Sequence, residues 1–225
     1  MPRRSPTSTK TDPGAPQMDS NAEFRRHSRR LFSVLRAIVR RGADSAGDER
    51  EFSARLEGRI GALGRVHEMI MRSPREGIDF EELVHGELLA QAVPPARFRV
   101  AGPDTRISAD AAMPMALALH ELAVNAVIHG AFANAQGSLE LTWEHCARDG
   151  REWLRVEWQE ATTHEQRHPP TMKGFGLELI ERSLPYELDA CTRVAWSPGG
   201  TRIGIEIPGG QPASNWHRDE RMPPP

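Results

Sequence analysis

The chain has 225 residues, of which 38% are hydrophobic and 27% charged, and this is the composition of a globular protein. Its formal net charge is −2, but residues 1–41 hold ten Lys and Arg against three Asp and Glu, so a uniformly basic nucleic-acid-binding protein is excluded. With no apolar run near the ~20 residues of a membrane-spanning helix, no apolar core of a secretory signal and only two cysteines, we expect a cytoplasmic protein without a membrane span.

Both ends of the chain are rich in Pro, Ser, Gly and charged residues and offer little apolar surface to bury. We therefore expect disordered tails over residues 1–20 and 209–225. The pattern of apolar residues changes at Pro74, which divides the body of the chain into two parts. Residues 21–74 predict a helical module, and residues 75–208 predict a compact domain.

Residues 22–42 and 48–72 each predict an amphipathic helix, because their apolar residues recur at spacings of three and four. The apolar stripes consist of Phe24, Leu31, Phe32, Leu35, Ile38 and Val39 in the first helix and of Phe52, Leu56, Ile60, Leu63, Val66 and Ile70 in the second. A short link makes the pair an antiparallel hairpin. Each stripe is wider than its partner can cover, so we expect two hairpins to pair into a four-helix bundle, and this predicts a homodimer.

The rest of the body mixes helices with strands. Helical patterns cover residues 79–91, 109–130 and 176–188, and strand patterns cover residues 98–102, 138–145, 152–160, 192–197 and 202–208. The alternation of apolar and polar residues in the strands is typical of a sheet with one buried face. Helices mixed with antiparallel hairpins indicate an α+β sandwich with the helices on one face of the sheet.

The segment LALHELAVNAVIHGA, residues 117–131, places Glu121 and Asn125 four residues apart and so on one face of a helix. A carboxylate beside a carboxamide suits a Mg²⁺ ion that keeps several waters and binds nucleotide phosphates. A surface helix with one polar face would have the same spacing, and the spacing alone does not choose between the two.

Two shorter segments could contribute to the same kind of site. Gly174 and Gly176 precede a helix and would leave its N-terminal amide groups open to an anion, although such a pair more often forms a tight turn. Glu160, at the end of the strand VEWQE, could accept a hydrogen bond from an adenine amino group or could be a solvated carboxylate.

In order and spacing, these segments resemble the catalytic part of an HWE-type sensor histidine kinase over residues 22–208. The family is named after a His in the helix motif and a Trp-x-Glu in the following strand, which are here His120 in HELAVNA and Trp158 with Glu160 in WQE. Further similar text lies in GRVHEMI, GPDTRIS, GSLELTW, GFGLELIER and SPGGTRIGIEIP.

The resemblance implies a dimerising helical hairpin with a phosphoacceptor histidine, followed by a GHKL (Bergerat-type) ATP-binding α/β sandwich. Such a protein phosphorylates itself on histidine with ATP and Mg²⁺, and it passes the phosphate to the receiver domain of a response regulator. Asn125 would coordinate Mg²⁺ with Glu121 beside it as a catalytic carboxylate, and Glu160 would recognise adenine. The resemblance also assigns further residues to the nucleotide site, the glycines shaping its lid: His120, Trp158, Gly174, Phe175 and Gly176.

The chain departs from the family at the phosphoacceptor and near the nucleotide. The family's first helix resembles E-L-x-H-R-V-K-N, and in EFRRHSRR its histidine position holds Arg26, with His27 one residue later. One residue turns a helix by about 100°, so His27 would present a different face. Further departures are Arg30 for the motif's Asn, Ile128 for a basic residue, and Ala161, Thr162 and Thr163 where glycines follow the Trp-x-Glu.

Two functions from different classes remain. The first is a protein-histidine kinase without its own sensor and with His27 as the phosphoacceptor, although His27 could equally be a solvated residue on an Arg-rich helix face. The second is a catalytically degenerate module that docks or sequesters a response regulator or a partner kinase. The retained Glu121, Asn125 and Glu160 favour the first, and the departures favour the second. A serine kinase similar to anti-sigma factors would share the sandwich, but the helical hairpin disfavours it.

Overall fold

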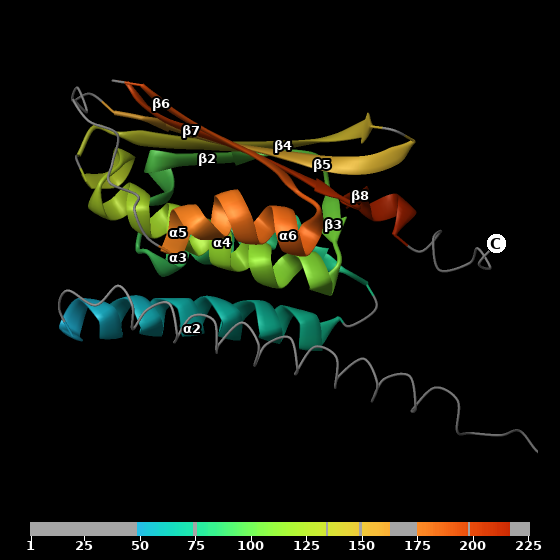
Figure 1. The fold of residues 1–225 in the computed structure, drawn as a ribbon, viewed down its shortest axis with the longest axis horizontal. Coiled ribbons are helices and arrows are strands. Elements are labelled where there is room, and N and C mark those ends of the chain that lie inside the picture. The colour runs from blue at the N-terminus through green and yellow to red at the C-terminus, as the bar shows by residue number, and fades with distance from the viewer. Residues whose placement is uncertain are drawn as a thin grey trace, which may run out of the picture.

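The computed structural model describes residues 49–73, 76–133, 135–148, 150–162, 175–197 and 199–216 (Figure 1). The first predicted helix, residues 22–42, lies outside the described residues, and so do the candidate phosphoacceptor His27 and the candidate lid residue Gly174.

A five-stranded sheet forms one layer of the molecule (Figure 1). Its strands, in spatial order, are β2 (Phe98–Ala101), β4 (Ser138–Arg148), β5 (Arg151–Ala161), β7 (Gly200–Pro208) and β6 (Cys191–Ser197). Only the pair β2–β4 is parallel, and the other neighbours are antiparallel. Alternate residues of β5, among them Leu154, Val156 and Trp158, are buried on the inner face, as the sequence pattern predicted.

Helices cover that inner face and leave the other face of the sheet open (Figure 1). They are α3 (Phe80–Ala90), α4 (Ala109–Ile128) and a helical run of α5 (Phe175–Glu178), η3 (Leu179–Ser183) and α6 (Leu184–Leu188), with short turns η1 (Pro95–Arg97) and η2 (Ala131–Ala133). The Asp79 carboxylate caps α3 and the Ser108 hydroxyl caps α4 by accepting from backbone N–H groups. The predicted helix 176–188 contains a π-helical turn at η3, next to Pro185, which has no N–H to donate.

The helix α4 is the centre of the core. By length and composition it could cross a membrane, which the sequence analysis did not expect of any segment. However, 78% of its most apolar window is buried inside the structure, between the sheet and the other helices. Its apolar composition is therefore that of a core helix.

The helix α2 (Glu49–Arg72) forms the outermost layer beneath α3 and α4 (Figure 1). Its apolar residues Leu63, Val66 and Ile70 are buried in the same hydrophobic core as α4. The hairpin and the four-helix bundle predicted for this stripe stay predictions, because the partner helix lies outside the described residues. At the edge of the buried stripe, Ile60 and Met71 are about half exposed, at 47% and 49%.

A small second sheet lies at one end of the molecule and corrects the predicted C-terminal boundary. It consists of β1 (Ile78–Asp79), β3 (Thr105–Ile107) and β8 (Gln211–Pro212), in that order, and η4 (Ala213–Asn215) follows it. The tail expected from residue 209 therefore begins later, because the backbone of residues 211–212 pairs with β3. The indole of Trp216 fills the space beside Gly77, where a Cβ would lie 2.5 Å from the ring.

Candidate functional site

The side chains of Glu121 and Asn125 project from the same face of α4, one turn apart, as their spacing predicted. Gly176 at the start of α5 lies against both. A Cβ at Gly176 would lie 3.1 Å from Glu121 Oε2 and 3.4 Å from Asn125 Nδ2. Only a glycine allows the α5 backbone to come so close without displacing these side chains. The structure therefore brings three of the predicted site residues together.

Asn125 is the member of this group that is free to bind a ligand. Its side-chain amide makes no hydrogen bond to any described residue, and the residue is only partly buried. Its backbone carbonyl closes α4 by accepting from the N–H groups of His129 and Gly130. A carboxamide held on a rigid helix with its oxygen unused fits the chemistry of a Mg²⁺ ligand.

Glu121, by contrast, is fully engaged. Arg59 of α2 donates from Nε to Glu121 Oε1 at 2.6 Å and from Nη2 to Glu121 Oε2 at 3.3 Å. The Arg59 guanidinium also stacks on the Phe175 ring, 4.0 Å from its centroid. Phe175 thus lies beside the predicted site, but the group that it contacts is an arginine of the helical module.

Glu160 lies near the C-terminal end of α4 and is buried, so it is not a solvated carboxylate. Its Oε1 accepts from Trp158 Nε1 at 2.9 Å, and its Oε2 accepts from the backbone N–H of Ala131 at 2.8 Å. Burial raises the pKa of this carboxyl above its usual range, and the two hydrogen bonds oppose the shift. Trp158, two residues earlier on the inner face of β5, is itself fully buried.

Two glycines make room for Glu160. A Cβ at Gly130 would lie 1.9 Å from Glu160 Oε2, and a Cβ at Gly200 would lie 1.9 Å from the Glu160 backbone oxygen. Beyond them, a hollow of about 330 Å³ opens at this end of β5, β6 and β7, and Glu160 and Thr201 are among the residues that line it. The carboxylate therefore has a fixed position beside an open space.

His120 lies apart from this group. Its imidazole is buried where α2 and α3 meet α4, with Nδ1 3.4 Å from Glu87 Oε2 and 3.4 Å from Gln91 Nε2. Its Nε2 points at Gly58 of α2, where a Cβ would come within 2.8 Å. The resemblance assigned His120 to the nucleotide site, but the structure brings it into contact with α2.

Residues that sequence reasoning missed are Arg59, Gly130 and Gly200. The two glycines stand in the motifs AVIHGA and SPGGTRI, where a glycine at the end of a predicted helix and a glycine just before a predicted strand were usable signals. Arg59 gave no signal, because a single arginine within an amphipathic helix is ordinarily a solvated residue. Three of the departures lie among the described residues: Ile128 is half exposed at the end of α4, Ala161 is the exposed last residue of β5, and the backbone N–H of Thr162 donates to the Gly199 carbonyl.

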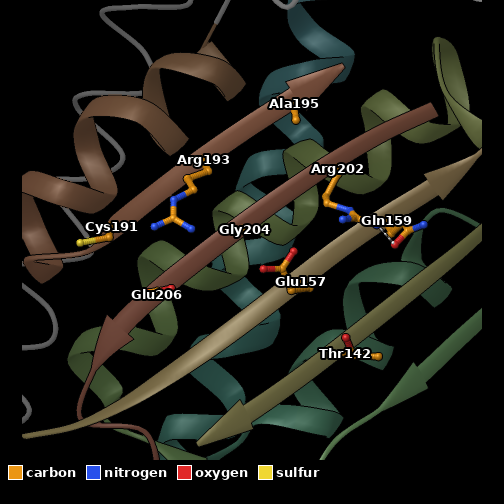
Figure 2. Close-up of a pocket in the computed structure, with 9 residues that line it drawn as sticks. All are labelled: Thr142, Glu157, Gln159, Cys191, Arg193, Ala195, Arg202, Gly204 and Glu206. Atoms are coloured by element: carbon orange, nitrogen blue, oxygen red, sulfur yellow. Dashed lines mark hydrogen bonds between the residues drawn. The ribbon is translucent and has the colours of Figure 1, made fainter. Parts of the chain in front are cut away.

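A larger hollow, of about 490 Å³, lies on the open face of the sheet (Figure 2). Its lining includes Glu157 and Arg193, which flank Gly204, and the pair Arg202–Gln159, joined by a hydrogen bond of 2.8 Å. None of the predicted site residues lines it. The sheet separates this hollow from Glu121 and Asn125.

A metal site made by the protein alone is not present among the described residues, which contain no group of three or more His, Cys, Asp or Glu able to hold an ion. This agrees with the chemistry of Mg²⁺, which often binds to one or two protein oxygens and takes its other ligands from water and phosphates. The donor set therefore fits Mg²⁺ through Asn125.

Comparisons with known proteins show which family and which fold the chain is similar to. The model of the family described as HWE histidine kinase matches residues 26–104. A blue-light-activated histidine kinase of Rhizobium johnstonii is 33% identical over 192 residues, which are 84% of this chain and 53% of that protein. Blue-light-activated histidine kinase 1 of Erythrobacter litoralis is 31% identical over 199 residues, which are 85% of this chain and 53% of that protein. The chain thus spans about half the length of these relatives.

Among solved structures, the histidine kinase domain of the Erythrobacter litoralis EL346 blue-light activated histidine kinase is similar, with a TM-score of 0.53 and 18% identity. The match covers 90% of this chain and 97% of that one. The fold is therefore the α+β, GHKL-type fold of histidine kinase catalytic domains, as the sequence predicted.

Proposed function

Because the chain belongs to the HWE histidine kinase family, we propose that it is an ATP-dependent protein-histidine kinase that acts in two-component signalling. The observation that carries the proposal is the free side-chain amide of Asn125, held one turn from Glu121 and in close contact with the Gly176 backbone. No described residue is a structural partner of this amide, and it fits a ligand that arrives with its own phosphates and waters.

The residues of the chain would bind and orient the nucleotide. Asn125 would hold Mg²⁺, which when bound neutralises charge on the phosphoryl group. Glu160 would accept from the adenine amino group with the lone pairs that Trp158 and Ala131 leave unused, and its two hydrogen bonds fix its orientation. Gly176 would let backbone N–H groups of α5 approach the phosphates.

The phosphoacceptor in this proposal is His27. The imidazole nitrogen that carries no proton would attack the terminal phosphorus of ATP, the bond to ADP would break, and the other ring nitrogen would lose its proton. An aspartate of a receiver domain would take the phosphoryl group next. The Arg-rich segment around His27 suits an acidic partner surface. A homodimer in the cytoplasm is part of the same proposal, and the half-exposed Ile60 and Met71 at the edge of the buried stripe of α2 support it.

One observation favours the second candidate, a kinase-like module that docks or sequesters a response regulator or a partner kinase. The ion pair with Arg59 neutralises Glu121 and uses one lone pair on each of its oxygens, so less of the carboxylate is left for chemistry at the nucleotide. A module that had lost catalysis could keep this ion pair for its stability.

Calorimetric titration with ATP and Mg²⁺ separates the two candidates. The wild-type protein should bind the nucleotide. Asn125→Ala should lose most of the affinity without loss of thermal stability, since the amide makes no hydrogen bond within the described part of the chain. Transfer of label from radioactive ATP, lost in His27→Ala, would complete the kinase assignment. Absence of binding at millimolar nucleotide would contradict it and leave the docking module.

A further inference from the structure

Two consecutive residues of α2 meet two consecutive residues of α4. Gly58 lies against His120, and Arg59 pairs with Glu121. We call these four residues the α2 clasp. His120 and Glu121 stand in the segment that the resemblance assigns to the nucleotide site, but in this structure each of them also contacts the helical module.

The Gly58 half of the clasp is a backbone contact. A Cβ at this position would lie 2.8 Å from His120 Nε2 and 3.0 Å from Cε1, which is closer than real Cβ atoms approach. The imidazole cannot easily retreat, because it is buried and its Nδ1 lies beside Glu87 and Gln91. The α2 backbone therefore sits directly on the ring, and glycine is what allows it.

The Arg59 half is electrostatic. Its guanidinium uses two nitrogens on the two oxygens of Glu121, and it stacks on Phe175 at the start of α5. One turn and a half further along α2, Arg65 makes a second bidentate pair with Glu87, the carboxylate beside His120. Buried charges of this kind hold only while both partners are in place, so the contact is either made or broken rather than gradually loosened.

We propose that the α2 clasp holds the helical module on the nucleotide-binding unit in a resting arrangement, and that it opens before phosphoryl transfer. This inference rests on the proposed function. While the clasp is closed, both oxygens of Glu121 accept hydrogen bonds from Arg59, which neutralises the carboxylate on the face of α4 that it shares with Asn125. When it opens, Glu121 becomes an unpaired carboxylate next to Asn125, and α2 is free to move together with the segment that holds His27.

The helix itself offers a matched pair of variants. Gly58→Ala and Gly64→Ala add the same methyl group to α2 and raise its helix propensity equally. Gly64 has no atom within 4 Å of an added Cβ, whereas the methyl at Gly58 meets His120. Any difference between the two variants therefore reports the clasp and not the propensity of the helix.

Amide hydrogen exchange in the nucleotide-free protein is the decisive measurement. We expect the amides of residues 55–70 to exchange at least tenfold faster in Gly58→Ala than in Gly64→Ala, while the amides of β4 and β5 exchange at the same rate in both. Equal exchange of α2 in the two variants would overturn the clasp. If Gly58→Ala fails to fold, Arg59→Lys tests it instead, since lysine keeps the charge but loses the two-nitrogen grip on Glu121.

A second measurement tests whether the closed α2 clasp is the resting arrangement. Incorporation of label from radioactive ATP should be at least threefold faster in Gly58→Ala than in Gly64→Ala. Faster exchange of α2 with equal or slower labelling would overturn the resting role. If no variant is labelled, the kinase proposal fails, and the exchange experiment still decides whether the clasp exists.

Discussion

Arg59 and Glu121, 62 residues apart in the chain, form a two-pronged ion pair whose side chains are only 5% and 10% exposed. The pair joins α2 to α4, so the helical module and the nucleotide-binding unit share one buried charge contact. Its energetics follow from desolvation: both charges have left water, and each depends on the other for compensation.

Removal of one partner of the pair should therefore lower the free energy of unfolding strongly, and removal of both partners should lower it much less. We expect Arg59→Met and Glu121→Met each to lower the free energy of unfolding by about 3–5 kcal/mol, because a buried charge is left unpaired. The double variant should recover most of that loss, and urea unfolding of all four proteins measures the difference. The exposed pair Arg72–Glu82 is the control, and Arg72→Met should cost less than about 1 kcal/mol. Additive losses in the double variant would contradict the pair's role.

The position of Gly176 leads to a second prediction, which can be tested separately from the first and concerns the side of α4 that would face the nucleotide. Its Cβ position lies 3.1 Å from Glu121 Oε2 and 3.4 Å from Asn125 Nδ2, so Gly176→Ala pushes on both side chains. Overpacking of this kind costs about 1–3 kcal/mol, and we expect nucleotide affinity to fall about tenfold or more. Gly86→Ala in α3 is the matched helical control, because its methyl would meet only Met69 Cε at an ordinary 3.5 Å. Equal affinities in the two variants would show that Gly176 is no part of the site.

Glu160 predicts a dependence of stability on pH. Burial raises the pKa of its carboxyl in the folded protein, so between the unfolded pKa of about 4.3 and the folded pKa the folded state binds more protons. Its contribution to stability is therefore fully present below the unfolded pKa and is lost as pH rises through the folded pKa. We expect the difference in unfolding free energy between wild type and Glu160→Gln to shrink from pH 4 to pH 7.5, measured by urea unfolding. A difference that grows over this range would contradict the burial of the ionised carboxyl.

Local patterns in the sequence predicted most elements of the fold. The segments with alternating apolar and polar residues form β4, β5 and β7, and the segments with helical spacing form α2, α3 and α4. The spacing of Glu121 and Asn125 correctly predicted that both side chains lie on one face of a helix. These are properties of a few neighbouring residues, and the sequence therefore contains them directly.

The contacts between distant segments could not be read in the same way. The apolar stripe of α2 looked the same whether it faced a hairpin partner or α4, since an amphipathic helix specifies a buried face but not what covers it. The partners of Arg59 and Glu121 were hidden for the same reason. Glu160 could be adenine-binding or solvated until Trp158, Ala131 and Gly130 were placed around it.

The last prediction concerns the C-terminal boundary of the domain. The polar composition after Pro208 predicted a tail, but residues 211–215 form β8 and η4. β8 pairs with β3, the His145 ring lies 3.1 Å from the Gly210 carbonyl oxygen, and Trp216 covers Gly77. A chain that ends at Pro208 loses all three contacts and exposes the edge of β3. We expect its melting temperature to fall by several degrees, which corresponds to about 1–3 kcal/mol for a domain of this size.

A chain that ends at Trp216 is the control for this truncation. It keeps every one of these contacts, so its melting temperature should equal that of the full chain. Trp216→Ala in the full chain isolates the indole and should reproduce part of the loss, since it opens a cavity beside Gly77. If truncation at Pro208 left the melting temperature unchanged, β8 and Trp216 would contribute nothing to the fold, and the domain would end where the sequence pattern ends.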